Sequence, residues 1–264
     1  MDNIYTLGID IGSTASKCVM LRDGKEIVSK SLISVGAGTS GPQRAIAEVL
    51  ESAGMTREQM AYVLATGYGR NSLEGIADHQ MSELSCHAKG ASFLFPDVHT
   101  VIDIGGQDVK GISIDTDGTV KNFAMNDKCA AGTGRFYEAM ARSFEMSLPE
   151  FSNLSLTARN VIPITAQCTV FAESEVITLV GEGKPMDEIA AGIQMAVAKR
   201  CFVMAKKAGA TDAITLTGGC AKNAGLKQAI ERVLKLKVID LKTDPQLMGA
   251  LGAAEYARQK GMAR

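Results

Sequence analysis

Tryptophan is absent from this 264-residue sequence, and aromatic residues make up only 5% of it. Such a chain offers few side chains on which the bases of a nucleic acid could stack. A basic excess is missing too, because 28 Lys and Arg residues face 29 Asp and Glu residues. We therefore expect no nucleic-acid partner.

Long hydrophobic runs are also missing. No apolar stretch approaches the roughly 20 residues that cross a bilayer, and Asp2 stands where a secretory signal would carry basic residues. We expect no membrane association and a cytoplasmic location. Apolar residues still make up 46% of the sequence, which is enough for a globular core.

Cysteines are few and scattered, and no two of them form a CxxC pair. This pattern argues against a disulfide framework, and in a cytoplasmic protein the thiols should stay reduced. Cys18 in a predicted strand and Cys201 on an apolar helix stripe are expected in the core. Cys86 and Cys220 are also expected to pack as small side chains. Two cysteines, Cys129 and Cys168, stand apart from these four.

One sequence pattern occurs twice. The segment 7–17 reads LGIDIGSTASK and the segment 101–110 reads VIDIGGQDVK, and an Asp-Gly turn follows each of them. The alignment pairs Asp10 with Asp103, Gly12 with Gly105, and Lys17 with Lys110. Each copy predicts a buried strand, a Gly-rich turn, a second strand and a hairpin to a third strand.

Two copies indicate two similar domains. We assign residues 1–97 to the first domain, joined by the C-terminal helical segment 245–264, and residues 98–244 to the second. The third strands of the copies are expected at Glu26–Ile33 and Val120–Met125. The remaining strands are predicted at Tyr62–Thr66, Val161–Thr165, Ala213–Thr217 and Lys237–Asp240. Helices are predicted at Pro42–Ala53, Met81–Phe93, Ala130–Met146, Thr169–Val180, Asp187–Lys207, Ala221–Leu234 and Pro245–Gln259.

Gly-rich turns that follow buried strands bring backbone N–H groups close to a bound anion. The expected phosphate-binding residues are Gly12, Ser13, Thr14, Ala15, Ser16 and Lys17 in the first copy, and Gly105, Gly106 and Gln107 in the second. A third turn, Thr217–Gly219, could lie against adenosine. Asp10 and Asp103 each end an apolar strand, where a carboxylate could hold Mg²⁺ directly or through water. Ordinary turns capped by Asp are the alternative.

Three such turns in this order resemble the actin, sugar kinase and chaperone ATPase superfamily. The resemblance implies an α/β fold of two similar actin-like (ribonuclease H-like) domains. Each domain would carry a mixed five-stranded sheet flanked by helices, with a nucleotide cleft between the domains.

Cys129 and Cys168 each lie where a helix is predicted to begin. The helix dipole and the free N–H groups there stabilise a thiolate or a negatively charged iron–sulfur cluster. A [4Fe–4S] cluster normally takes one thiolate per iron, so two cysteines supply half of a ligand set. A symmetric homodimer would supply the other half. Alternatively, both cysteines are ordinary small residues near helix starts.

Several segments together resemble the activators of 2-hydroxyacyl-CoA dehydratases, and the resemblance extends over essentially the whole chain. The segments are Asp10–Lys17, Gly67–Arg70, Ser82–His87, Asp103–Asp108, Met125–Arg135 and Cys168–Glu175. The resemblance implies a homodimer that holds one [4Fe–4S] cluster through Cys129 and Cys168 of each chain. It also implies binding of ATP or ADP with Mg²⁺ near Asp10 and Asp103, and a water positioned by Gln107 or Asp108.

The same resemblance implies partners and a reaction. An electron from reduced ferredoxin or flavodoxin would pass to the dehydratase (component D), driven by ATP hydrolysis. The expected target within the family is 2-hydroxyglutaryl-CoA dehydratase, an enzyme of anaerobic amino-acid fermentation.

Three other functions remain open at this point. The chain could serve a benzoyl-CoA reductase-type enzyme, act as a cluster-free small-molecule kinase of the same superfamily, or be a nucleotide-binding scaffold without turnover. Iron content separates the first of these from the other two.

Overall fold

The computed structural model describes residues 3–166 and 168–261, which form two compact units. Unit 1 comprises Met1–Val98, Ile114–Lys121 and Leu241–Arg264, and unit 2 comprises His99–Ser113 and Asn122–Asp240. Asp2 and residues 262–264 lie outside the described residues. The hairpin tip Ile114–Lys121, which the sequence analysis gave to the second domain, groups with unit 1. There Lys89 Nζ donates a hydrogen bond of 2.8 Å to the carbonyl of Asp117.

Unit 1 is built on a five-stranded mixed sheet of order β3-β2-β1-β4-β5. Its strands are β1 (Tyr5–Ile11), β2 (Ser16–Arg22), β3 (Glu26–Ile33), β4 (Tyr62–Thr66) and β5 (His79–Gln80), and its helices are α1 (Gly41–Ala53), α2 (Glu83–Leu94) and α8 (Met248–Gly261). Short 3₁₀ turns lie at Arg57–Gln59, Arg70–Leu73 and Pro245–Leu247. β1 runs antiparallel to β2 and parallel to β4. The strands predicted at 26–33 and 62–66 are confirmed at both ends.

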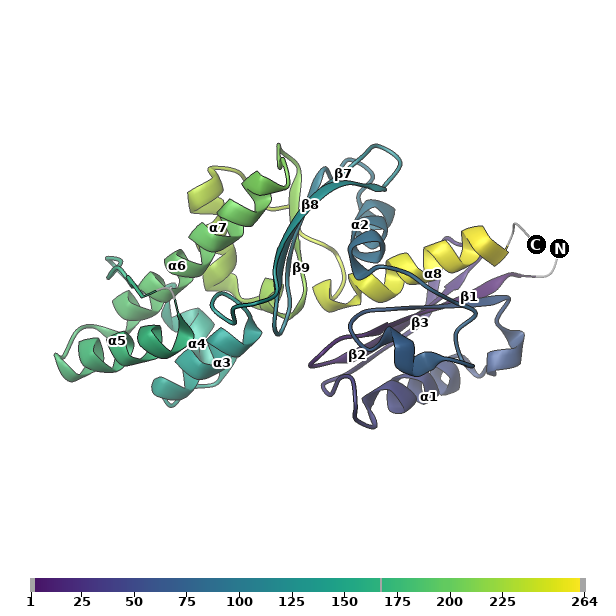
Figure 1. Ribbon diagram of the computed structural model, residues 1–264, viewed down its shortest axis with the longest axis horizontal. Coiled ribbons are helices and arrows are strands. Elements are labelled where there is room, and N and C mark those ends of the chain that lie inside the picture. Colours follow the sequence, from purple (N-terminus) through teal and green to yellow (C-terminus); the bar gives the residue numbers. More distant parts are fainter. Residues whose placement is uncertain (1–2, 167, 262–264) are drawn as a thin grey trace. The chain divides into compact units, whose positions relative to one another are not determined.

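The side chains of β1 point alternately to the two faces of the sheet, and each face of the sheet packs against a different helix of unit 1. Leu7, Ile9 and Ile11 pack with Ala45 and Val49 of α1 on one face. The opposite face lies against α8, and Figure 1 shows α1 and α8 on the two sides of this sheet. Side chains of a strand alternate between faces, so Asp10 points to the same side as Gly8, toward α8.

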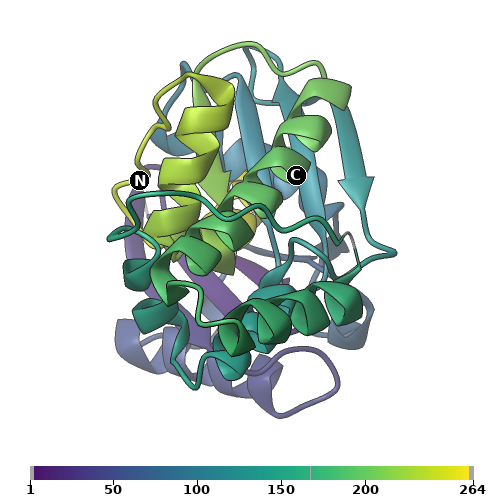
Figure 2. The same ribbon diagram turned by 90° about the vertical axis from the view of Figure 1, so that its left-hand side faces the viewer.

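Unit 2 repeats the same topology with strand order β8-β7-β6-β9. Its strands are β6 (Thr100–Ile104), β7 (Val109–Ile114), β8 (Val120–Asn126) and β9 (Ile214–Thr217), and its helices are α3 (Gly134–Ser143), α4 (Leu148–Leu154), α5 (Thr169–Gly181), α6 (Met186–Lys207) and α7 (Ala224–Leu234), with a 3₁₀ turn at Gly219–Lys222. β6 runs antiparallel to β7 and parallel to β9, as β1 does to β2 and β4. Figure 2 shows α6 crossing this unit diagonally, with α7 beside it.

Two expectations for the second sheet are wrong. The sheet has four strands instead of five, because the segment predicted at 237–240 contributes an isolated bridge between Ile239 and Thr215. The segment 161–165 forms no strand. Pro163 lies in its middle and has no N–H group for a sheet ladder, and Ile162 donates its own N–H to the carbonyl of Glu188 in α6.

The helix predicted from residue 130 begins only at Gly134. Gly132 has a φ of +94°, a conformation that interrupts a right-handed helix. The hydroxyl of Thr133 then donates to the carbonyl of Ala130 at 2.6 Å, which closes a turn before α3. Cys129 therefore lies in a loop and does not directly precede a helix.

None of the helices within the described residues is long and apolar enough to cross a membrane.

The crossing of α2 and α8 depends on glycine. A Cβ atom on Gly252 would lie 1.8 Å from the carbonyl oxygen of Cys86, and one on Gly90 would lie 2.1 Å from that of Met248. We predict that Gly252→Ala destabilises the protein by about 1–3 kcal/mol through overpacking, although alanine is the better helix former. Urea unfolding measures this.

A matched control is Gly181→Ala at the end of α5, where nothing lies within 4 Å of an added Cβ atom. That variant should unfold like the parent or at slightly higher urea. Equal stability of Gly252→Ala and the parent would show that the helix crossing adjusts without cost.

Candidate functional site

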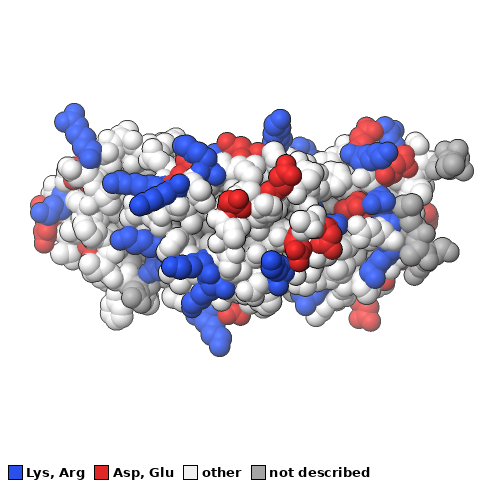
Figure 3. All heavy atoms as spheres, turned by 90° about the horizontal axis from the view of Figure 1, so that it is seen from above, with Lys and Arg blue, Asp and Glu red and all other residues white. Residues whose placement is uncertain are grey.

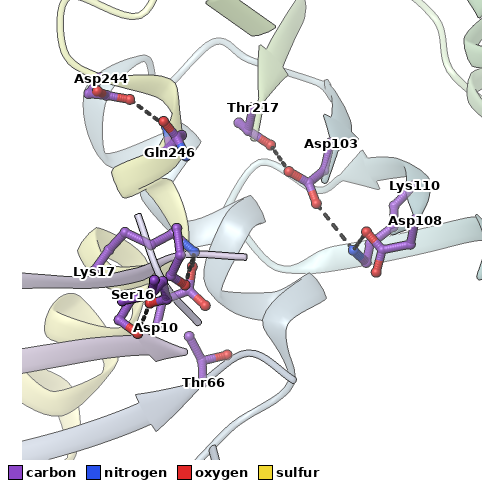
Figure 4. Close-up of polar contacts among 12 residues, drawn as sticks. Asp10, Ser16, Lys17, Thr66, Asp103, Asp108, Lys110, Thr217, Asp244 and Gln246 are labelled. Atoms are coloured by element: carbon purple, nitrogen blue, oxygen red, sulfur yellow. Dashed lines mark hydrogen bonds and ion pairs between the residues drawn. The ribbon is translucent and has the colours of Figure 1, made fainter. Parts of the chain in front are cut away.

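The carboxylate of Asp10 is buried at the end of β1 and is paired with a lysine. Asp10 lies opposite Lys17 in the antiparallel register of β1 and β2, and Lys17 Nζ is 2.9 Å from Asp10 Oδ2. Asp10 is 3% exposed. A buried carboxylate requires such a partner, since an isolated charge is strongly disfavoured in a protein interior. Figure 4 shows this pair.

Backbone from two glycines approaches the same carboxylate. A Cβ atom on Gly67 would lie 2.4 Å from Asp10 Oδ1, and one on Gly249 would lie 2.6 Å from Asp10 Oδ2. The added atom on Gly249 would also lie 3.1 Å from Nε2 of His87, a buried residue of α2. The residue after β4 and the start of α8 therefore approach Asp10 so closely that a side chain at Gly67 or Gly249 would collide with its carboxylate.

Unit 2 holds the equivalent pair. Asp103 lies opposite Lys110 in the register of β6 and β7, with Lys110 Nζ 3.2 Å from Asp103 Oδ2. The same ammonium is 2.7 Å from Oδ1 of Asp108. Thr217 at the end of β9 donates its hydroxyl to Asp103 Oδ1 at 2.7 Å. Figure 4 shows these contacts of Asp103.

The repeat extends to a Thr-Gly pair that sequence reasoning used in only one copy. Thr66 and Thr217 end the strands parallel to β1 and β6. The following residues, Gly67 and Gly218, have φ values of +88° and +84°. A Cβ atom on either would lie within 3 Å of the strand-end aspartate. The signal for Thr66 and Gly67 was present, since a strand followed by Thr-Gly occurs in both copies.

The first Gly-rich turn divides into a solvent-accessible and a buried part. Gly12, Ser13 and Thr14 are half-buried, whereas Ala15, Ser16 and Lys17 are buried. The hydroxyl of Ser16 donates to the carbonyl of Val35 at 2.8 Å. The part of this turn that an anion can reach is therefore residues 12–14.

The second turn closes in the same way and is joined to α3. Gly105 N–H donates to the carbonyl of Asp108 at 3.0 Å, as Gly12 N–H does to that of Ala15 at 2.9 Å. The carbonyls of Gly105 and Gly106 accept hydrogen bonds from the N–H groups of residues 134 and 135. The turn is thus bonded to the helix that follows the Cys129 loop. Gln107 is exposed at its tip.

Solvent exposure divides the cysteines into two groups. Cys129 and Cys168 are exposed, and the other four are buried. Burial raises the pKa of each buried thiol, Cys18, Cys86, Cys201 and Cys220, to about 12. Those four thiols are protonated at neutral pH, so they are poor nucleophiles and poor metal ligands.

The two exposed cysteines have different local structures. Cys168 directly precedes α5 as its N-cap residue. Cys129 lies in the loop before α3, where its carbonyl accepts a hydrogen bond of 3.3 Å from Asn126 Nδ2. Arg200 of α6 lies beside this loop, because a Cβ atom on Gly132 would be 3.3 Å from its Cδ. In the described portion of a single chain, no group of three or more His, Cys, Asp or Glu residues could hold a metal ion.

Comparison with known proteins places these features in a family. Residues 7–257 match the BadF/BadG/BcrA/BcrD ATPase family. The chain belongs to this ATPase family. A curated relative from Acidaminococcus fermentans, the (R)-2-hydroxyglutaryl-CoA dehydratase activating ATPase, is 57% identical over 98% of this chain and 98% of its own length. The predicted family resemblance is thereby confirmed.

Solved structures agree with this family assignment. The activator of 2-hydroxyisocaproyl-CoA dehydratase from Clostridium difficile, determined with bound ADPNP, has a TM-score of 0.93 and 45% identity, and the match covers 98% of this chain and 96% of that one. A glucokinase of the ROK family from Streptomyces griseus is 14% identical, with a TM-score of 0.61 over 97% of this chain and 99% of that one. The second likeness concerns the fold alone and, with the mixed sheets described above, confirms the predicted actin-like α/β class.

The buried pair in unit 1 of this ATPase generates a stability prediction. Lys17→Met removes the ammonium from Asp10 and leaves a buried charge, which should cost about 3–5 kcal/mol. Adding Asp10→Asn should restore part of that loss, because the unpaired charge is gone. Urea unfolding of the nucleotide-free protein measures both variants.

Lys25→Met serves as the control, since Lys25 is an exposed residue of the following hairpin and should shift stability by no more than about 0.5 kcal/mol. If Lys17→Met unfolds at the same urea concentration as the parent, Asp10 does not depend on Lys17.

Cysteine exposure in this ATPase generates a second prediction. Iodoacetamide should modify Cys129 and Cys168 of the native, iron-free protein and leave the four buried thiols unmodified. Peptide mass spectrometry identifies the labelled positions. Denaturation in urea before labelling should expose all six cysteines. Labelling of a buried thiol at the rate of Cys168 would contradict the burial described above.

Proposed function

We propose that this chain is the ATP-dependent activator of a 2-hydroxyacyl-CoA dehydratase, and that it passes one electron to that enzyme. Two features together carry the proposal. Each unit ends its first strand in a buried aspartate that is paired with a lysine. Cys129 and Cys168 are exposed, whereas the other four cysteines are buried. The 57% identity to a dehydratase-activating ATPase supports the same target class. We propose a 2-hydroxyglutaryl-CoA dehydratase as the target.

ATP and ADP are the proposed nucleotides, with phosphates at residues 12–14 of the first turn and 105–107 of the second. Thr217, Gly218 and Gly219 are proposed to contact adenosine. Both aspartates already carry a lysine ammonium, at 2.9 Å for Asp10 and 3.2 Å for Asp103. Partial neutralisation by lysine favours contact with Mg²⁺ through its waters, which Mg²⁺ gives up reluctantly. We propose that Gln107 or Asp108 orients the attacking water.

Cys129 and Cys168 fit a [4Fe–4S] cluster as half of its ligands. Both thiols are accessible, both belong to unit 2, and the N-terminus of α5 adjoins one of them. Such a cluster takes one thiolate per iron, so a second copy of the chain would supply the other half. When bound, the cluster would supply one-electron chemistry at low potential.

Apolar side chains beside both cysteines support a homodimer. Val170, Phe171 and Ile177 of α5 are 65%, 69% and 59% exposed. Phe123 and Met125 of β8, shortly before Cys129, are also exposed. Solvent-exposed apolar groups in a cluster mark an interaction surface. We propose that a second copy covers the exposed apolar side chains of α5 and of β8.

An acidic electron carrier, ferredoxin or flavodoxin, is the proposed donor. Between residues 199 and 240 the acidic residues Asp212, Glu231 and Asp240 are each paired with a basic group. Apart from Lys237, which pairs with Glu231, the exposed basic side chains of this segment are Lys199, Lys206, Lys207, Lys222, Arg232 and Lys235. Figure 3 shows Lys and Arg gathered over the left-hand part of the view, where unit 2 lies. Such a surface attracts a protein of opposite charge.

The test is the iron and sulfide content, with the molecular mass, of protein purified without oxygen. We expect about two iron atoms and two sulfides per chain, since one four-iron cluster is shared by two copies, and a dimer mass. Cys129→Ala and Cys168→Ala should each abolish the iron and weaken the dimer, whereas Cys18→Ala should retain both. We also expect the parent protein to hydrolyse ATP in the same preparation.

Two outcomes would contradict the proposal. A metal-free monomer that hydrolyses ATP would favour a small-molecule kinase. A Cys129→Ala dimer with the full iron content would show that the cluster is held elsewhere.

A further inference from the structure

A single carboxylate holds the segment that leads into Cys168. Glu175 lies in the second turn of α5, and its Oε1 and Oε2 accept the N–H of Thr165 at 3.0 and 3.1 Å. Oε2 also accepts the N–H of Ala166 at 2.9 Å, and Oε1 accepts the hydroxyl of Thr165 at 2.9 Å. The side chain thus reaches back past the start of its own helix and binds the backbone two residues before Cys168.

This anchor and the helix fix Cys168 from both sides. On its C-terminal side, the carbonyl of Cys168 accepts the N–H of Ala172 at 2.9 Å, which is the first bond of α5. On its N-terminal side, residues 161–166 have no regular secondary structure. Farther back, Ile162 N–H is bonded to the carbonyl of Glu188. Among the described residues 161–166, those nearest to the cysteine, Thr165 and Ala166, are the two that Glu175 holds.

The hydrogen bonds to Glu175 are strong because their acceptor is an ionised carboxylate. Hydrogen bonds to an ionised acceptor are shorter and roughly twice as strong as those between neutral groups. Partial burial acts to raise the pKa of Glu175, but the N–H groups of Ala166 and Thr165 and the Thr165 hydroxyl outweigh it, and the pKa lies below its usual value. The carboxylate is consequently ionised at neutral pH and keeps its donors.

The contact between Glu175 and Thr165 lies near the surface of unit 2, outside its hydrophobic core. Thr165 is exposed and Glu175 is half-buried, so their contact adds little to the hydrophobic core of unit 2. The buried side chains of α5 are Ala172 and Val176, on either side of the anchor in sequence. The contact of Glu175 with Thr165 and Ala166 therefore restrains the segment before Cys168 and does not contribute to the hydrophobic core.

We propose that Glu175 is a positioning residue that holds the Cys168 thiolate in the orientation required of a cluster ligand. This inference rests on the proposed function, since it concerns Cys168 as a ligand. Through Thr165 and Ala166, Glu175 reduces the conformations open to the cysteine before any iron is bound. A ligand that is ordered in advance loses less entropy on binding, and its iron is released more slowly.

The test compares Glu175→Gln with the parent. Glutamine has the same shape, but it carries no charge and replaces one acceptor oxygen by an NH₂ group. Glu182→Gln is the matched control, because Glu182 is exposed directly after α5. In the iron-free protein, amide hydrogen exchange at Thr165 and Ala166 should be about tenfold faster in Glu175→Gln and unchanged in the control. The free energy of unfolding, measured in urea, should fall in Glu175→Gln by no more than about 1.4 kcal/mol, the equivalent of that tenfold change, and should stay at the parent value in the control.

A second measurement concerns the iron-loaded protein. Loss of iron to bathophenanthroline should be about tenfold faster in Glu175→Gln, and the electron paramagnetic resonance spectrum of the reduced protein should change. A residue with a merely structural role would leave the spectrum unchanged.

Each outcome decides one part of the inference. Unchanged amide exchange would overturn the anchor. Faster exchange with parent-like iron release and spectrum would overturn the positioning role. A parent protein that never takes up iron would overturn the proposed function and the role of Cys168 as a ligand, while the exchange measurement would still report on the anchor.

Discussion

The buried pair of aspartate and lysine at the end of each first strand is the constraint on which the candidate site depends. Asp10 and Lys17 face each other because the antiparallel register places them opposite, and the same holds in unit 2. A carboxylate that is 3% exposed needs a cation or hydrogen-bond donors as partners, and glycine backbone also lies close to each aspartate. The positive-φ glycines after the parallel strands, Gly67 and Gly218, provide that backbone. In each unit the strand register, the ion pair and the close glycine therefore belong to one local arrangement.

A second arrangement joins the Gly-rich turn of unit 2 to the loop that carries Cys129. The carbonyls of Gly105 and Gly106 accept the first N–H groups of α3, and that helix follows the loop carrying Cys129. The two segments are also closely packed, since a Cβ atom on Gly134 would lie 3.1 Å from the Cα of Gly106. A displacement of the turn cannot leave the start of α3 in place without breaking these bonds. Under the proposed function, a nucleotide phosphate bound at this turn would therefore alter the surroundings of Cys129.

Sequence reasoning succeeded where the determining interactions are local. The strand at 26–33 follows from an Asp-Gly turn and residue alternation, and the strand at 62–66 is a short apolar run that is buried throughout. It failed at 161–165, where Pro163 outweighed the apolar residues, and at 130, where Gly132 delays the helix. Gly249, His87 and Glu175 were not recognised, because their meaning lies in contacts between distant segments. A sequence pattern does not show which distant residues come into contact in the folded protein.

The exposed cysteines and the apolar surface beside them depend on each other energetically. Val170, Phe171 and Ile177 are left in water by a single chain, and covering apolar area contributes about 25 cal/mol per Å². Under the proposed function, two thiolates from one chain are half of a ligand set, and a second copy would supply the other half. Under the proposed function, cluster binding therefore favours the dimer, and the dimer in turn raises the affinity for the cluster. The exposed apolar side of α5 next to Cys168 would then be covered in the dimer instead of lying in water.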